Sequence, residues 1–110
     1  MRLRSTARRL PAALTLSLLA GAAAAQGADA RALHQAALAA TCANCHGTQG
    51  RAVDGAAVPG LAGMPAAYLA EQMRAFKAGT RAATVMHQIS KGYSDGQIDA
   101  IAAYFAAQKR

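Results

Sequence analysis

The chain has 110 residues, with 12 Lys and Arg against 5 Asp and Glu, three histidines and two cysteines. Four of the arginines lie in the first 25 residues, so residues 26–110 carry eight basic and five acidic side chains, a net charge of +3. The net positive charge is small, and residues 26–110 contain no cluster of Lys and Arg interleaved with aromatic residues. Both observations argue against nucleic acid as a partner. Residues 26–110 suffice for one domain, near the size at which a side-chain core alone is marginal.

The first 25 residues have the layout of a secretory signal peptide. A basic start precedes a mostly apolar run over residues 10–19 and an alanine-rich segment that ends in an Ala-x-Ala pattern. The basic residues are Arg2, Arg4, Arg8 and Arg9. We predict cleavage after Ala25 and export to the periplasm. A second Ala-x-Ala pattern at residues 28–30 offers an alternative cleavage site a few residues further on. A retained membrane anchor is the alternative, but a spanning helix needs about 20 apolar residues and Pro11 interrupts this shorter run.

The segment 29–41 is predicted to be the first helix after the signal peptide, with Asp29 as its N-cap. A thin apolar stripe at helical spacing is formed by Leu33, Ala37 and Leu38. Residues 47–64 contain five glycines and Pro59, which predicts a long irregular loop. Loops of this length are uncommon in small domains unless they serve a function, so we expect this one to wrap around a ligand.

A second helix is predicted over residues 65–78, with Pro65 at its first position and Gly79 at its end. Its apolar face is formed by Leu69, Met73 and Phe76. A short helical turn over residues 85–90, stopped by Gly92, follows.

The last predicted helix follows a capping box, in which Ser94 is the N-cap and Gln97 lies three residues further on. It extends to about Gln108. Its apolar residues recur at the i, i+3, i+4, i+7 spacing of a buried helix face: Ile98, Ile101, Ala102 and Phe105. No segment alternates convincingly with period two, so the predicted fold class is all-α.

The stretch TCANCHG contains both cysteines of the chain, Cys42 and Cys45, followed at once by His46. A thioredoxin-like redox pair would require a βαβ setting, which the pattern lacks. A structural zinc site needs four ligands, and His34 and His87 do not have the usual spacing. A catalytic pair is disfavoured because adjacent side chains point apart, and a disulfide across so short a loop would be strained and would leave the histidine unexplained.

The remaining interpretation uses all three residues, because Cys-x-x-Cys-His is the attachment signature of c-type haem. The thiols of Cys42 and Cys45 add across the two vinyl groups of one haem c, and His46 becomes the proximal iron ligand. Attachment follows export, which agrees with the predicted signal peptide. We therefore predict one covalently bound haem c.

The second axial ligand of the iron must come from elsewhere in the chain. The candidates are Met64, Met73, Met86, His34 and His87. Met86 lies 40 residues beyond His46, after the second helix has reversed the chain, which allows approach from the opposite haem face. Spacing therefore favours Met86 and leaves the others open, with Met73 more suited to packing in the helix stripe.

The segments CANCHG, VPGLAGMPAAYLAEQMRAFKAG, TVMHQISKGYS and IDAIAAYFAAQ occur in an order that resembles the small class I cytochromes c, over residues 31–108. Residues 84–105 most resemble the haem subunit of flavocytochrome c sulfide dehydrogenase. The run Lys91–Ser94 contributes to that likeness, although an ordinary helix stop and restart would also account for it.

The resemblance implies that the N- and C-terminal helices pack together around one haem, as in the single-haem members of this family. It implies that Met86 is the distal ligand and that the Pro59 carbonyl accepts a hydrogen bond from the His46 ring. It also implies that Tyr104 packs where the first and last helices cross.

The predicted function is outer-sphere electron transfer by a non-catalytic protein. The resemblance implies a flavoprotein (FAD) subunit of sulfide dehydrogenase as electron donor, and a free shuttle between respiratory complexes and an oxidase or reductase is the alternative. A haem enzyme or ligand sensor would need an open iron position, which Met86 argues against. Candidate side chains for steering a partner are Arg51, Lys77, Arg81 and Lys91.

Overall fold

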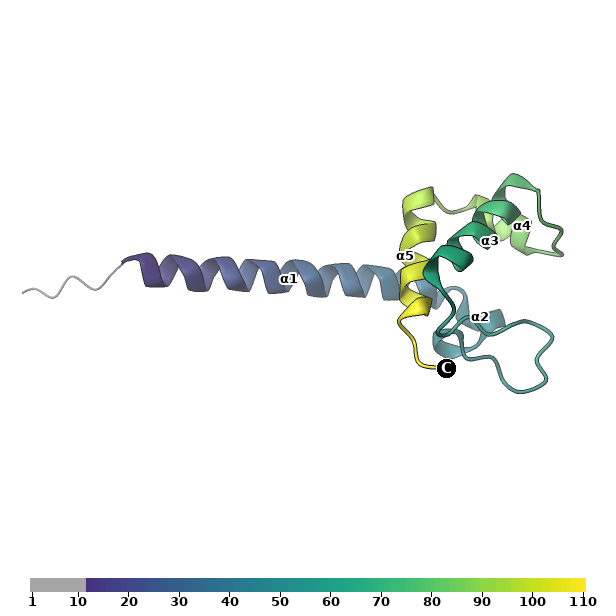
Figure 1. Ribbon diagram of the computed structural model, residues 1–110, viewed down its shortest axis with the longest axis horizontal. Coiled ribbons are helices and arrows are strands. Elements are labelled where there is room, and N and C mark those ends of the chain that lie inside the picture. The colour runs from purple at the N-terminus through teal and green to yellow at the C-terminus, as the bar shows by residue number, and fades with distance from the viewer. Residues whose placement is uncertain (1–11) are drawn as a thin grey trace, which may run out of the picture. The chain divides into compact units, whose positions relative to one another are not determined.

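The computed structural model describes residues 12–110, which divide into two units on either side of the Arg31–Ala32 bond. The described residues form helices and no strand, which confirms the all-α prediction (Figure 1). The helices are α1 (Ala12–Ala40), α2 (Ala43–His46), η1 (Thr48–Gly50), α3 (Ala66–Ala78), α4 (Met86–Lys91) and α5 (Asp95–Ala106).

Helix α1 begins earlier than predicted. It is continuous from Ala12 to Ala40, so Asp29 lies inside the helix and the prediction that this residue is the N-cap is wrong. The physical reason is the alanine-rich sequence before Asp29, which has high helix propensity and contains no proline after Pro11. The basic start of the predicted signal peptide lies outside the described residues. Among residues 12–110, no helix has both the length and the hydropathy required to cross a membrane.

The core of the unit formed by residues 32–110 is built on the predicted apolar stripe of α5. All four stripe residues are buried: Ile98, Ile101, Ala102 and Phe105. They pack with Leu69 and Ala70 of α3 and with Ala39 near the end of α1, and Tyr104 is half-buried against the same core. The first and last helices of the cytochrome-like segment thus share one core.

The ends of α3 and α5 follow the predicted capping chemistry closely. Pro65 is the N-cap of α3 rather than its first helical residue, and Gly79 ends the helix in the left-handed conformation. At the start of α5, the Ser94 side chain accepts a hydrogen bond from the Gln97 N–H, and the Gln97 side chain accepts one from the Ser94 N–H. The predicted capping box is therefore confirmed.

The loop of residues 47–64 packs closely against α5 at Phe105. The Gly50 carbonyl accepts hydrogen bonds from the N–H groups of Leu61 and Ala62, and the Gly63 N–H donates to the Phe105 carbonyl. Gly50 has φ +77°, and a Cβ there would lie 2.7 Å from the Phe105 ring. Only glycine combines this backbone conformation with this packing.

The C-terminal residues of the described chain also contact the loop. The Arg51 Nε donates to the Lys109 carbonyl at 2.8 Å, and the Arg110 guanidinium lies 3.4 Å from the Gly63 carbonyl. Two ion pairs, Arg74–Asp99 and Lys77–Asp95, join α3 to α5. Because these pairs are largely exposed to solvent, packing rather than charge holds the helices together.

Candidate functional site

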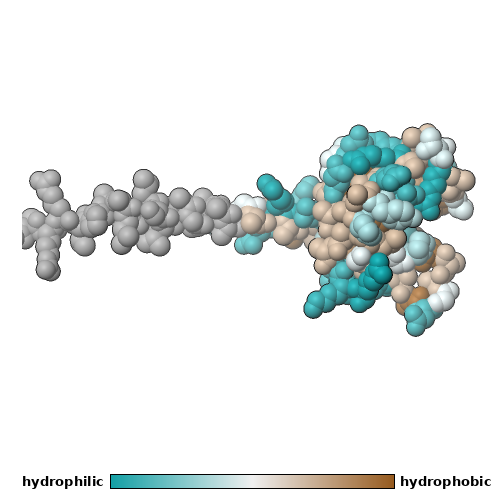
Figure 2. All heavy atoms as spheres, in the orientation of Figure 1, coloured by the Kyte–Doolittle hydropathy of each residue, from teal (hydrophilic) through white to brown (hydrophobic). Residues whose placement is uncertain are grey.

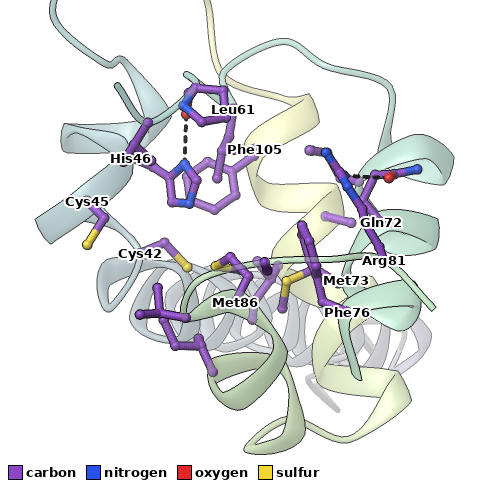
Figure 3. A pocket seen from close by; sticks show the side chains of 18 of the residues that line it. Cys42, Cys45, His46, Leu61, Gln72, Met73, Phe76, Arg81, Met86 and Phe105 are labelled. Atoms are coloured by element: carbon purple, nitrogen blue, oxygen red, sulfur yellow. Dashed lines mark hydrogen bonds between the residues drawn. The ribbon is translucent and has the colours of Figure 1, made fainter. Parts of the chain in front are cut away.

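A cavity of about 690 Å³ lies inside the unit formed by residues 32–110 (Figure 3). Its walls come from the segment around α2, the loop of residues 47–64, α3, α4 and α5. Most lining side chains are apolar, and Leu69, Ile101 and Phe105 belong both to its wall and to the core. The volume and the apolar lining are typical of a ligand pocket, for which the usual range is about 300–1,000 Å³.

Three large apolar side chains at the cavity wall remain substantially exposed to solvent. They are Tyr68, Val85 and Ile89. Figure 2 shows hydrophilic and apolar atoms mixed over the visible face of the unit formed by residues 32–110. The cavity therefore has an apolar rim that a large apolar ligand would cover.

The cysteines and the histidine of the Cys-x-x-Cys-His motif all line this cavity. Helix α2 is a single turn closed by a hydrogen bond from the His46 N–H to the Cys42 carbonyl at 2.9 Å. Both thiols are free, with Cys42 half-buried and Cys45 exposed. Burial raises the pKa of the Cys42 thiol, so this group is protonated at neutral pH. This one-turn helix was not predicted, because four residues are too few to show a helical period.

The imidazole of His46 is buried and held by the loop. Its Nδ1 lies 2.7 Å from the Pro59 carbonyl oxygen, the contact expected from the family resemblance (Figure 3). A carbonyl can only accept, so Nδ1 carries the hydrogen and Nε2 keeps its free lone pair. The ring is thereby set in the tautomer that can bind a metal through Nε2.

The loop reaches Pro59 because the chain turns sharply after His46. Gly47 has φ +83° and ψ 158°, a combination almost confined to glycine. A Cβ at this position would lie 2.0 Å from the Arg51 carbonyl oxygen. The glycine that follows the motif is therefore required by the backbone and lets the loop fold back toward the imidazole.

All three methionines proposed as distal ligands, Met64, Met73 and Met86, line the cavity. The sulfur of Met73 accepts a hydrogen bond from the buried Ser90 hydroxyl at 3.5 Å, which assigns that side chain to the packing between α3 and α4. Met86 is the first residue of α4. Figure 3 shows its sulfur pointing into the space near Cys42.

The two other histidines do not line the cavity. His34 is exposed on α1, and the Nδ1 of His87 is buried without a hydrogen-bond partner. Within residues 12–110, no group of three His, Cys, Asp or Glu side chains comes together as a metal site would require. The site therefore offers one imidazole, two thiols and thioether sulfurs, which is one Cys or His ligand short of a structural zinc site.

A hydrogen bond that was not predicted ties the residue before the motif to Tyr93, in the connection between α4 and α5. The Thr41 hydroxyl donates to the Leu38 carbonyl and lies 2.7 Å from the Tyr93 hydroxyl. Because threonine has one hydroxyl hydrogen, Tyr93 is the donor of the second bond. The partners lie 52 residues apart in the chain, and no local pattern could have indicated the pair.

The side chains considered for partner steering have different surroundings. Arg51 contacts the C-terminal segment, and Lys77 donates to the Tyr93 carbonyl at 2.8 Å and to Asp95. Lys91 and Arg81 are both exposed, and Arg81 also lines the cavity. Arg81 thus borders both the cavity and the solvent.

The comparisons with known proteins agree with this geometry. The family model of cytochrome c matches residues 30–109. The chain is 42% identical to a thiosulfate dehydrogenase electron acceptor from Thiomonas intermedia, over 64% of the chain and 33% of that protein. It is 38% identical to the cytochrome subunit of sulfide dehydrogenase from Chlorobaculum tepidum, over 59% of the chain and 57% of that protein. It is also 38% identical to cytochrome c-554(548) from Halomonas halodenitrificans, over 63% of the chain and 86% of that protein.

The chain belongs to the cytochrome c family. Membership of this family implies covalently bound haem c, and the similarity to a sulfide dehydrogenase cytochrome subunit agrees with the predicted resemblance. The chain spans only about a third of the length of the thiosulfate dehydrogenase electron acceptors that it matches.

The residues present fit a haem. The cavity is large and apolar, two free thiols lie at one end, and a buried imidazole turns its unprotonated nitrogen toward the interior. A haem c requires two thiols for its thioether bonds and a nitrogen ligand for its iron.

Proposed function

We propose that residues 26–110 form an exported domain that binds one haem c. Cys42 and Cys45 form the thioethers, and His46 and Met86 are the proximal and distal iron ligands. The observation that supports this assignment is that all four side chains line one apolar cavity. When bound, the haem supplies an iron that alternates between the ferric and ferrous states.

The protein's own residues hold the site in a state suited to electron transfer. The Pro59 carbonyl orients the His46 ring and raises its basicity as a ligand. Apolar walls exclude water, and a thioether sulfur is a soft ligand that favours the ferrous state, so both raise the reduction potential. If His46 and Met86 both bound the iron, no iron ligand position would be left for a substrate, as electron transfer without catalysis on the haem requires.

The same proposal places the domain in the periplasm, after removal of residues 1–25, as the electron acceptor of a dehydrogenase that oxidises sulfur compounds. Three of its relatives are named as electron acceptors or cytochrome subunits of thiosulfate or sulfide dehydrogenases. Together with the likeness of residues 84–105, this supports a sulfide dehydrogenase whose partner subunit is a flavoprotein (FAD). The second candidate is a free electron shuttle, which the 86% coverage of cytochrome c-554(548) favours.

The assignment of Met86 is tested by Met86→Ala. We expect the haem to remain covalently attached while the sulfur–iron charge-transfer band of the ferric protein disappears. Met73→Leu is the matched control, because its sulfur is engaged by Ser90 and its loss should leave the band in place. If Met86→Ala retains the band, the distal ligand is Met64 or Met73.

The partner is tested by gentle purification of the native protein from the periplasm. A stoichiometric flavoprotein in the same peak, reduced by sulfide before the haem is reduced, would support the sulfide dehydrogenase subunit. A lone red protein that does not respond to sulfide would establish the free shuttle instead. Thiosulfate should be tested in parallel, because relatives of the chain accept electrons from thiosulfate dehydrogenase.

A further inference from the structure

Met73 and Met86 present two thioether sulfurs to one cavity, although the iron has a single ligand position opposite His46. In Figure 3 both sulfurs face the interior from the side opposite the His46 ring. The two side chains are chemically identical, so ligand softness does not favour one over the other. The contacts of each methionine with its surroundings must therefore decide which sulfur reaches the iron.

Ser90 is the polar side chain that distinguishes the two methionines. Its exposed fraction is 0%, and its hydroxyl donates a hydrogen bond to the Met73 sulfur at 3.5 Å. Within the part of the chain that the structure describes, this sulfur is the one side-chain partner of the hydroxyl. If Met73 turned its sulfur toward the iron, the buried hydroxyl would lose this bond. Leaving a buried donor unpaired disfavours that arrangement by roughly five- to a hundredfold.

Helix α4 carries both Ser90 and the proposed ligand. The helix begins at Met86, and Ser90 lies four residues further on, so the two side chains project from the same face. This face packs toward α3, which carries Met73. When α4 directs the Met86 sulfur into the cavity, it therefore also brings the Ser90 hydroxyl to Met73. One helix placement supplies the ligand and restrains its competitor.

We propose that Ser90 selects the distal iron ligand by holding the Met73 sulfur away from the iron. The inference rests on the proposed function, because it requires a covalent haem with Met86 as its distal ligand. Ser90 acts as a positioning residue: its hydroxyl occupies a lone pair of the Met73 sulfur and fixes the direction of that side chain. Without the hydroxyl, Met73 is free to bind the iron whenever Met86 does not.

The test compares Met86→Ala with Met86→Ala/Ser90→Ala, both loaded with haem, by the sulfur–iron charge-transfer band of the ferric protein. The single variant should lack the band, because Ser90 still holds Met73. The double variant should recover it, because Met73 is released. Adding Met73→Leu to the double variant should abolish the recovered band and so identify the sulfur that binds.

The matched control is Ser94→Ala in the Met86→Ala background. This change also removes a serine hydroxyl and weakens the fold, but Ser94 caps α5 and its hydroxyl bonds to Gln97 rather than to a methionine. The band should stay absent. Its recovery in this control would mean that any loosening of the fold releases a methionine, which would overturn the inference.

A folded Met86→Ala/Ser90→Ala protein without the band, or a recovered band that survives Met73→Leu, would also overturn the inference. If the double variant does not fold, Ser90→Ala alone is examined by NMR with isotope-labelled methionine methyl groups. The order parameter of the Met73 methyl should fall, because the hydrogen bond no longer restrains it, and an unchanged value would overturn the inference.

The two proposals fail in different ways. If the mass of the wild-type protein shows no covalent haem, or if Met86→Ala keeps the band, the proposed function fails in that respect and this inference fails with it. If Met86→Ala loses the band and the folded double variant does not regain it, the ligand assignment stands and the inference alone is overturned.

Discussion

The helices α3–α5 and the loop of residues 47–64 build opposite parts of the same site by different means. The helices are held by a shared apolar core, in which Ile98 and Phe105 are almost completely buried. The loop has few buried side chains and is held by backbone contacts, such as those of Gly50 with residues 61 and 62. The helical part is therefore specified by many exchangeable apolar contacts, and the loop by a few positions that tolerate little change.

The largest effect is expected from loss of the haem, because the helices and the loop would both lose their contacts with it. In Cys42→Ala/Cys45→Ala the haem can no longer be attached, and a cavity of about 690 Å³ between the helices and the loop would stay unfilled. Empty apolar volume of this size is strongly destabilising, so we expect loss of cooperative unfolding. Circular dichroism during heating measures this. A compact double variant with a sharp melting transition would show that the helices fold without the haem.

The loop is tested next by Gly47→Ala in the haem-loaded protein. The backbone strain costs about 1–3 kcal/mol, and the contact of the new Cβ with the Arg51 carbonyl adds to it, so we expect a loss of at least about 3 kcal/mol in the free energy of unfolding. Denaturant titration followed at the haem absorption provides the measurement.

The matched control for this variant is Gly55→Ala. Gly55 also has positive φ, but no atom lies within 4 Å of the position its Cβ would take. Its substitution should cost about 1 kcal/mol, from the backbone conformation alone. Equal losses of unfolding free energy in the two variants would mean that the turn after His46 relaxes easily. The loop would then tolerate substitution better than its contacts indicate.

The smallest effect is expected at the start of α5. Ser94→Ala removes a helix cap and should lower the free energy of unfolding by about 1 kcal/mol, without change in the haem spectrum. Ser94→Thr, which keeps the hydroxyl, should cost much less. Urea unfolding of the three proteins gives the comparison. A change in the spectrum of Ser94→Ala would show that the helices and the haem site are more tightly coupled than the packing suggests.

The difference between the regions also explains what can be predicted from the sequence. The stripe of α5 and the caps at Ser94 and Gly79 are local patterns, and the structure confirms them. The start of α1 was misplaced because an alanine-rich run has no stop signal before Asp29. Periodicity therefore locates helices better than it locates their ends.

The features of the site likewise separate into those that follow from local sequence and those that depend on long-range packing. The motif at residues 42–46 predicts its chemistry without any structure, because its residue types and spacing are specific. The contact of His46 with Pro59 was expected only from the family resemblance, since nothing in the loop's composition selects one carbonyl. The Thr41–Tyr93 bond and the place of Arg81 in the cavity wall depend on long-range packing, which one sequence does not show.

The contacts between the loop and the C-terminal segment have a consequence for the order of folding. Arg51 and Lys109 are 58 residues apart, and Gly63 and Arg110 are 47 apart. Closing such long segments has an entropic cost before any contact forms, whereas α3, α4 and α5 are neighbours in the chain and can associate early. We expect the helices to assemble first and the loop to close over the bound haem last, so the haem can enter while that side of the cavity is still open.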